Sequence, residues 1–202
     1  MSIDPKISTP AVAEYLLLIE PRKDLCEAIT AIKKAFYKQY KAQDALSGKP
    51  HLTLVSYKQY TSFESRIIQK LRTVTKQLSP VLIELCDYGA FPTHTIFINV
   101  ISRSAIQSVV KSIRSELQHL MKLDKDNKPH FIMEPHITVA RRLKPGQFEA
   151  AWLACSHGSF SGRFIAGSMV LLKRGAPDQK YTLAERFEFE GLPARASQAL
   201  LF

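Results

Sequence analysis

Two short stretches of the sequence share one pattern: KPHLTLVSY at residues 49–57 and EPHITVARR at residues 134–142. In each, a proline precedes a histidine that is followed by an aliphatic residue, a threonine and a second aliphatic residue. His51 and His136 are 136 − 51 = 85 positions apart, so this is not a local repeat. The alternation of polar and apolar residues predicts a β-strand at each copy. Two equivalent histidines that meet at one site would explain the repetition.

The segments around the two motif strands occur in the same order twice. A strand, a helix, the motif strand, a helix and two strands are predicted, with the strand at 95–101 ending one pass and starting the next. The first helix has an apolar stripe of Leu25, Ile29, Ile32 and Phe36. The predicted segments are strand 14–20, helix 25–36, motif strand 51–57, helix 67–78, strands 81–88 and 95–101, helix 106–117, motif strand 136–142, helix 148–155 and strands 163–174 and 181–190. The matching order predicts an α+β chain with two similar lobes, each presenting one motif strand.

Length and composition set the domain organisation. The 202 residues are enough for one domain or two closely packed lobes, and no break in composition marks a linker. We expect a flexible lead-in over residues 1–12, a single bilobal domain over 13–190 and a tail over 191–202.

Charge and cysteine content narrow the classes of function. The net charge of +10 favours anionic partners such as nucleotides or RNA, although a merely solvated surface explains it equally well. Three scattered cysteines without a Cys-x-x-Cys spacing argue against a disulfide framework and a zinc site, and fit the reducing cytosol. The N-terminus lacks a signal-peptide pattern, and the apolar runs are too short to span a membrane. We therefore expect a cytoplasmic protein without a membrane segment.

Strand alternation groups the motif residues by face, because residues i and i+2 point the same way. Leu52, Leu54, Ile137 and Val139 are then directed into a core. The opposite face is predicted to carry His51, Thr53, Val55 and Tyr57 in the first copy, and His136, Thr138, Ala140 and Arg142 in the second.

This set of side chains suits phosphodiester chemistry. One neutral and one protonated imidazole can serve as base and acid near neutral pH. Threonine hydroxyls can donate to the non-bridging phosphate oxygens, which carry charge in the transition state. His-x-Thr is not a usual ligand spacing, so no metal is expected. A single copy would more often be structural, but two copies at matching places favour a site.

The paired motifs HLTL (51–54) and HITV (136–139) resemble those of the 2H phosphoesterase superfamily, which is named for two His-x-Thr/Ser-x motifs. The likeness is to the bacterial 2′-5′ RNA ligase-like (LigT-like) branch and covers about residues 13–190. It implies a bilobal α+β fold with two pseudo-symmetric lobes, antiparallel sheets lining a central cleft and helices outside. It also implies 2′,3′-cyclic phosphodiesterase activity or reversible 2′-5′ RNA ligation, without metal, ATP or other cofactor.

The resemblance also implies roles for particular residues. His51 and His136 would be catalytic, and Thr53 and Thr138 would bind phosphate. Family members often have an arginine five residues after the second histidine, where Arg141 stands. Simple alternation places Arg142 rather than Arg141 on the active face, so both are candidates for phosphate binding; the first copy has Ser56 at the corresponding place.

Two aromatic residues are candidates for stacking on a base. Tyr57 continues the motif face, and Phe91 precedes a turn that could overhang the cleft; packing alone would explain either. The partners expected are RNA ends or small cyclic nucleotide phosphodiesters, bound by a monomer. The natural substrate stays open among RNA, tRNA fragments, cyclic nucleotides and ADP-ribose cyclic phosphate. The alternative functions are a non-catalytic RNA- or nucleotide-binding module with the same cleft, and a purely structural interaction protein.

Overall fold

The alternating segments of the sequence form one antiparallel sheet in the computed structural model, which describes residues 10–192. Residues 1–9 of the expected lead-in and 193–202 of the expected tail lie outside this range. The strands are β1 Val12–Ile19, β2 Leu52–Tyr60, β3 Val81–Phe91, β4 Thr95–Val100, β5 His130–Phe131, β6 His136–Ala140, β7 Ser161–Ala166, β8 Ser168–Arg174 and β9 Thr182–Glu188. The helices of the described range are α1 Lys23–Tyr40, α2 Glu64–Gln77, α3 Arg103–Leu117 and α4 Pro145–Ser156, with short 3₁₀ helices η1 Gln43–Leu46 and η2 Thr61–Phe63.

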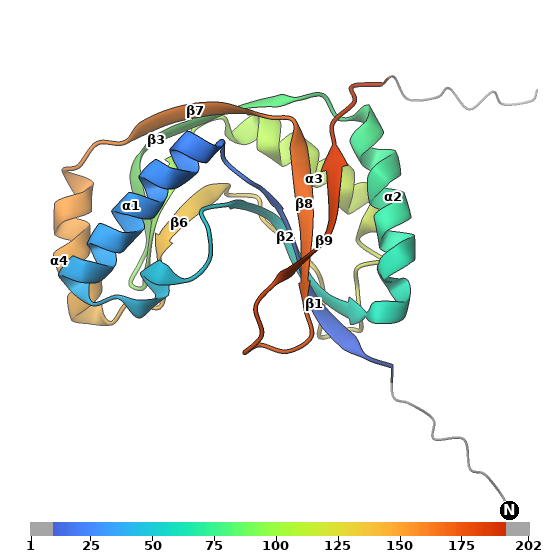
Figure 1. The fold of residues 1–202 in the computed structure, drawn as a ribbon, viewed down its shortest axis with the longest axis horizontal. Helices are drawn as coiled ribbons and strands as arrows, with labels where there is room; N and C mark the ends of the chain where they lie inside the picture. The colour runs from blue at the N-terminus through green and yellow to red at the C-terminus, as the bar shows by residue number, and fades with distance from the viewer. Residues whose placement is uncertain (1–9, 193–202) are drawn as a thin grey trace, which may run out of the picture.

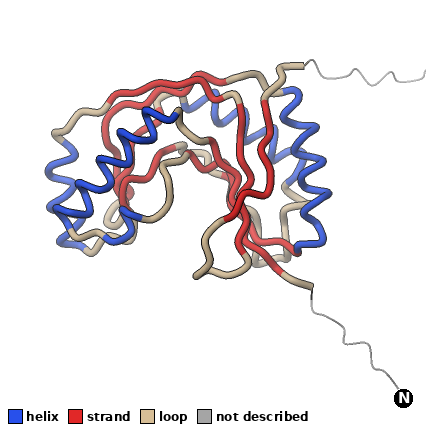
Figure 2. The backbone as a smooth tube through the Cα atoms, viewed as in Figure 1, coloured by secondary structure: helices blue, strands red, loops and turns tan. Residues whose placement is uncertain are grey.

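The sheet consists of two halves that meet at the motif strands. The strand order is β7-β3-β4-β6-β2-β1-β8-β9, and β5 adds to β2 beside β6. We call β7-β3-β4-β6 the β6 half and β2-β1-β8-β9 the β2 half. They join where Leu52 of β2 pairs with Ile137 of β6. The curled sheet forms an arch (Figures 1 and 2), and the predicted bilobal α+β fold is confirmed.

The two halves exchange elements along the chain. β3 comes after β1 and β2 in the chain, but it pairs with β4 and so belongs to the β6 half. β8 comes after β6 and β7, but it pairs with β1 and so belongs to the β2 half. Helix α1 crosses in the same way, because it follows β1 but packs against β6 and α4, whereas α2 stays with the β2 half and packs against β9 and α3. Figure 1 shows α1 and α4 together on one side of the arch and α2 on the other. Neither half of the sheet is therefore built from one continuous half of the chain.

Each motif strand contains a β-bulge at the third residue after its histidine. The extra residues are Leu54 in β2 and Val139 in β6, because the neighbouring strands skip them in the pairing. A bulge interrupts the alternation of faces, so residues beyond it point the opposite way to the prediction. The residue following each bulge, Val55 or Ala140, is accordingly buried next to its buried predecessor.

The predicted strand over residues 163–174 is wrong as a single element. It is two strands, β7 and β8, separated at Gly167. β7 pairs with β3 at the edge of the β6 half, whereas β8 pairs with β1 in the β2 half. The run of strand-favouring residues hid the break, because only Gly167 interrupts it and the chain crosses between halves there.

Candidate active site

The four motif residues lie on one face of the sheet, around the junction of its halves. Leu52 and Ile137 are paired and fully buried beneath them. If this antiparallel pairing is continued by one residue on each side, each motif histidine stands opposite the threonine of the other motif. Directly opposed residues have Cβ atoms about 4.5–5.5 Å apart and diagonal neighbours about 7–8 Å. The four residues that the register groups in this way, all partly exposed, are His51, Thr53, His136 and Thr138.

Both histidines have the same hydrogen bond. Nδ1 of His51 is 2.8 Å from the carbonyl oxygen of Lys49, and Nδ1 of His136 is 2.8 Å from that of Glu134. A carbonyl only accepts, so each Nδ1 donates its proton and Nε2 is the basic nitrogen of the neutral ring. A buried proline follows each accepting residue and restricts its backbone to extended conformations, which fixes the carbonyl. The Pro-His pairs thus set both imidazoles in the same tautomer.

The surroundings lower the pKa of both histidines. Burial is the main cause for His51, and the charges of Lys33, Arg141 and His136 lower its pKa further, against the hydrogen bond to Lys49. Burial also lowers the pKa of His136, while its hydrogen bond to the Glu134 carbonyl and the Glu134 charge oppose the shift. Both shifts favour the neutral form of the rings, in which Nε2 can act as a base.

The two imidazoles have different neighbours. The ring of His136 contacts Phe91 edge-on, at 5.0 Å between centroids, and Phe97 at 4.9 Å. Phe97 lies across Gly89 of β3, where a Cβ atom would be 2.5 Å from its ring. Phe91, one of the two stacking candidates, is partly exposed beside this cluster. The charges of Lys33 and Arg141 act on His51 instead, so the two motif histidines have unlike environments.

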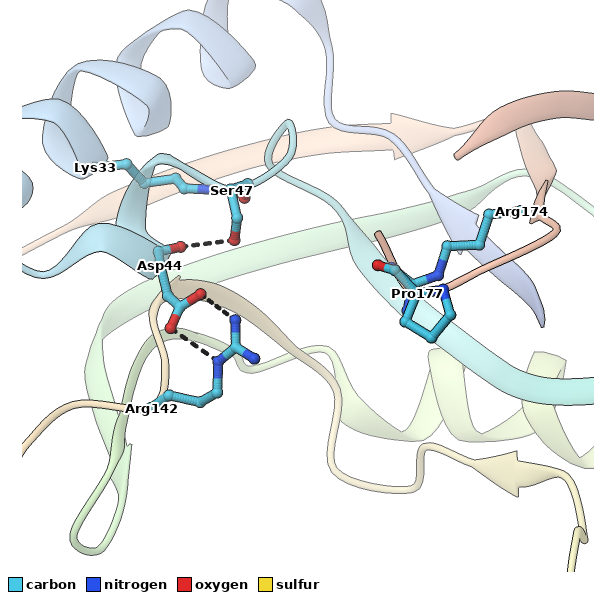
Figure 3. Close-up of polar contacts among 6 residues, drawn as sticks. All are labelled: Lys33, Asp44, Ser47, Arg142, Arg174 and Pro177. Carbon is cyan, nitrogen blue, oxygen red and sulfur yellow. Dashed lines mark hydrogen bonds and ion pairs between the residues drawn. The ribbon is translucent and has the colours of Figure 1, made fainter. Parts of the chain in front are cut away.

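The structure separates the two arginines after the second motif. Arg142 has a left-handed backbone, φ 53°, and its guanidinium pairs with Asp44 of η1, with Nε 2.8 Å from Oδ2 (Figure 3). Arg141 is exposed and is among the charges that, after burial, lower the pKa of His51. The bulge at Val139 explains why Arg141 rather than Arg142 lies on the face of the motif residues. It turns Ala140 into the core, so the next residue, Arg141, points outward. Ser56, the counterpart of Arg141 in the first motif, is partly exposed.

The structure contradicts the expected position of Tyr57. Its side chain is only 5% exposed, and its ring stacks on Tyr15 with centroids 5.0 Å apart and planes inclined by 11°. The bulge at Leu54 is the cause, since it reverses the faces beyond Thr53. Tyr57 is thus a core residue and does not share the face of His51.

Sequence reasoning missed three residues around the site. Phe97 packs on His136, Asp44 holds Arg142, and Lys33 of α1 is buried near His51. For Lys33 the signal was present, because a lysine four residues after Ile29 falls within the apolar stripe of the helix. No pattern marks Phe97 or Asp44, since their roles depend on pairing between distant segments.

Other features lie apart from the motif residues. A cavity of about 790 Å³ between α2 and α3 is lined by Arg66, Lys70, Glu116 and Lys122 among others, near the far end of β2. None of the four motif residues lines it. Residues 10–192 contain no cluster of three or more histidine, cysteine or acidic side chains that could hold a metal ion. Within the same range, no helix has both the length and the apolarity needed to cross a membrane.

Comparisons with known proteins agree with this fold. Residues 21–178 match a family model described as the 2′-5′ RNA ligase superfamily. A Bacillus licheniformis protein with a provisional phosphoesterase name is 25% identical over 138 residues, which are 64% of this chain and 72% of that protein.

Solved structures share the fold at lower sequence identity. TT0787 of Thermus thermophilus superposes with a TM-score of 0.64 at 17% identity, covering 88% of this chain and 98% of its own. E. coli LigT complexed with 3′-AMP gives a TM-score of 0.60 at 14% identity, covering 89% and 98%. Paired His-x-Thr motifs on such a bilobal sheet define the class of 2H phosphoesterases. Within that class, the chain belongs to the 2′-5′ RNA ligase superfamily.

Proposed function

We propose that this protein is a metal-independent phosphoesterase that acts on 2′,3′-cyclic phosphates or on 2′-5′ phosphodiesters at RNA ends. The observation that carries the proposal is the matched pair of imidazoles, His51 and His136. They share one face of the sheet and have identical Nδ1 hydrogen bonds. Two neutral rings, one of which can take up a proton, are what paired acid and base catalysis at phosphorus requires.

In hydrolysis of a cyclic phosphate, one imidazole accepts a proton through Nε2 from water as its oxygen attacks phosphorus. The other imidazole, protonated, gives a proton to the ribose oxygen as its bond to phosphorus breaks. In the ligation direction a ribose hydroxyl takes the place of water and each histidine keeps its role. In the reverse reaction, in which a ribose hydroxyl attacks the 2′-5′ phosphodiester and the cyclic phosphate forms again, the two histidines exchange roles. The Nδ1–H donated to a carbonyl holds each ring in place and stabilises its protonated form.

The neighbouring side chains have supporting roles. Thr53 and Thr138 donate hydrogen bonds to the non-bridging oxygens, and Arg141 compensates their charge. Arg142 is engaged by Asp44, which favours Arg141 over it as the phosphate ligand. Phe91, beside His136, is the residue that we place against a nucleobase.

The substrate class follows from charge and from the related proteins. The net charge of +10 attracts anionic substrates. The solved structures of E. coli LigT include complexes with 3′-AMP, NADP⁺, ATP and phosphate, so this fold can hold phosphate and nucleotides. We place the protein in the cytoplasm as a monomer acting on RNA ends or small cyclic nucleotide phosphodiesters.

The test is hydrolysis of 2′,3′-cyclic AMP and a 2′-5′ dinucleotide in the presence of EDTA. His51→Ala and His136→Ala should each lower kcat about 10²–10⁴-fold, the usual contribution of a general acid or base. Thr53→Val and Thr138→Val should lower it less, about 10–10³-fold, because each removes one donor to phosphate. His157→Ala, at an exposed position after α4, is the matched control and should keep full activity.

Two outcomes would contradict the proposal. One is complete loss of turnover on chelation that a divalent ion restores. The other is a folded His51→Ala or His136→Ala variant with nearly full kcat. A non-catalytic nucleotide-binding module is the alternative, and it predicts calorimetric binding of both compounds without any turnover by the wild type.

A further inference from the structure

Lys33 occupies a core position of α1. The buried side chains of this helix are Leu25, Ile29, Lys33 and Phe36, so a lysine stands where the stripe was predicted to contain Ile32. Its side chain is only 6% exposed. Removing an ammonium group from water is costly unless other groups compensate it, so a lysine at this place calls for an explanation.

The partners of Lys33 are backbone carbonyls. Nζ donates to the carbonyl oxygens of Gly48, at 2.9 Å, and Ser47, at 3.1 Å. None of the ion pairs within residues 10–192 includes Lys33. Burial and the nearby charge of Arg141 lower its pKa. Lys33 is therefore a buried cation with neutral partners, next to a candidate catalytic histidine.

Those carbonyls belong to the segment that positions His51. Gly48, with φ +67°, is the third residue before the histidine and is followed by Lys49, whose carbonyl accepts from His51 Nδ1. On its other side the segment is held by Asp44, whose backbone carbonyl accepts from the Ser47 hydroxyl and whose carboxylate pairs with Arg142 (Figure 3). Lys33 thus fixes the turn that leads directly into the first motif.

The second motif has an anchor at the matching place. Nε2 of Gln107 in α3 donates to the carbonyl oxygen of Met133 at 2.9 Å. Met133 is the third residue before His136, as Gly48 is the third before His51. In both motifs the helix that precedes the motif strand supplies this side chain. The anchor of the first motif is charged, whereas that of the second is neutral.

We infer that Lys33 and Gln107 are matching positioning residues of the two motifs, and that the charge of Lys33 adds to the electrostatic difference between the two histidines, to which Arg141 beside His51 and Glu134 beside His136 also contribute. The catalytic part of this inference rests on the proposed function. Arg141, and His136 when it is protonated, also lower the pKa of His51, and neither belongs to α1. Removing Lys33 therefore removes one defined charge and leaves those groups in place.

The first experiment needs no substrate. The imidazole signals of His51 and His136 are followed by NMR from pH 4.5 to pH 9. In Lys33→Met the titration of His51 should move to higher pH, because a nearby cation no longer opposes its protonation, whereas that of His136 should change little. Lys34→Met, which removes an exposed charge of the same helix, is the control and should move neither. Lys33→Gln, which keeps a hydrogen-bond donor without the charge, gives the same reading should Lys33→Met fail to fold.

The second experiment measures turnover of 2′,3′-cyclic AMP. Lys33→Met and Gln107→Leu should each lower kcat about 10–100-fold, the effect of misplacing a catalytic group by about 1 Å, with a smaller change in KM. Of the two variants, only Lys33→Met should also move to higher pH the limb of the pH–rate profile that reflects the titration of His51. An unmoved His51 titration in a folded Lys33→Met variant would overturn the inference even if the wild type is active. Absence of turnover in the wild type, with the NMR shift present, would refute the proposed function and leave the electrostatic role of Lys33 standing.

Discussion

At the scale of single residues, the proline before each motif histidine has a structural reason. Pro50 and Pro135 are buried, and each restricts the residue whose carbonyl accepts from the following imidazole. The repeated Pro-His pairs were visible in the sequence, but the carbonyl two residues before each histidine was not. The motif therefore specifies a tautomer as well as a place on a strand.

The lowered pKa values of His51 and His136 predict a loss of stability in mild acid. Below the ordinary histidine pKa of 6.5 the unfolded chain binds protons that the folded chain does not. The free energy of unfolding should therefore fall as the pH drops from about 6.5 towards the folded pKa values, and this contribution should level off below them. Urea unfolding at pH 7.5 and pH 5.5 measures the fall, and the His51→Gln/His136→Gln variant should show less of it.

Asp44 also contributes to a pH-dependent stability, but in a lower pH range than the two histidines. The Arg142 hydrogen bond lowers the pKa of Asp44 below its ordinary value of 3.8, so its contribution is lost only in stronger acid. An equal loss between pH 7.5 and pH 5.5 in the wild type and the double variant would show that the two imidazoles are not responsible.

Arg141 and Arg142 should differ in function despite being neighbours. Arg141→Met should raise KM and lower kcat/KM for 2′,3′-cyclic AMP about 10-fold or more, because the proposed mechanism uses its charge to bind the phosphate. Arg142→Met should leave kcat nearly unchanged, since Asp44 already engages this guanidinium. Steady-state kinetics of both variants at one ionic strength decides between them. A larger effect of Arg142→Met would place the phosphate on the other side of the strand end.

At the scale of elements, strand and helix positions were predictable because their periodicities are local. The faces of β2 and β6 were predicted correctly only as far as the bulges at Leu54 and Val139. Beyond these residues the direction of a side chain depends on which residue the neighbouring strand skips, and that is a property of the pairing. Tyr57 was misplaced for this reason, and the choice between Arg141 and Arg142 stayed open.

Gly89 of β3 should be sensitive to the addition of one methyl group. In Gly89→Ala the new Cβ would lie 2.5 Å from both the Phe97 ring and the Asn99 side chain. Relief of this clash must displace the ring that packs on His136. We expect a loss of about 1–3 kcal/mol of stability, as for other overpacked sites, together with a lower kcat.

Thermal melts and the NMR signals of the His136 ring measure both effects. Gly146→Ala in α4, where a Cβ meets nothing within 4 Å, is the control and should not destabilise the protein. If Gly89→Ala proves neutral in both measurements, Phe97 is not held against His136 by close packing.

At the scale of the whole molecule, the two lobes share one sheet and one continuous apolar core. The sequence indicated the lobes through the repeated order of elements. It did not indicate how they are joined, because strand exchange and the break at Gly167 arise from contacts between distant segments. The single Leu52–Ile137 pair at the junction lies directly beneath the motif residues. Geometry at the candidate site therefore depends on the relative position of the halves.

The shared core predicts cooperative unfolding. Leu52→Ala and Ile137→Ala should each lower the free energy of unfolding by about 2–5 kcal/mol, because both side chains are fully buried. Their combined effect should differ from the sum, since the residues are in contact. Fluorescence of Trp152, the sole tryptophan, and far-UV circular dichroism should report one coincident urea transition.

Leu153→Ala, at an exposed position of α4, is the control and should change stability by no more than about 0.5 kcal/mol. Separate transitions for the two signals would mean that the halves unfold independently.

The exchange of β3 and β8 between the halves has a consequence for the origin of the chain. The six central strands form two triplets, β3-β4-β6 and β2-β1-β8. If the chain is divided between β3 and β4, the first part supplies β3 to the triplet of the second part, and the second part supplies β8 to the triplet of the first. Two copies of a half-length ancestor that swapped their last strand would produce the same arrangement as a symmetric dimer. Each copy would then need only one His-x-Thr motif, and the two-histidine centre would exist only in the dimer. Fusion of the duplicated genes would make that centre independent of protein concentration and free the two copies to diverge, and such divergence would account for a lysine before one motif and a glutamine before the other.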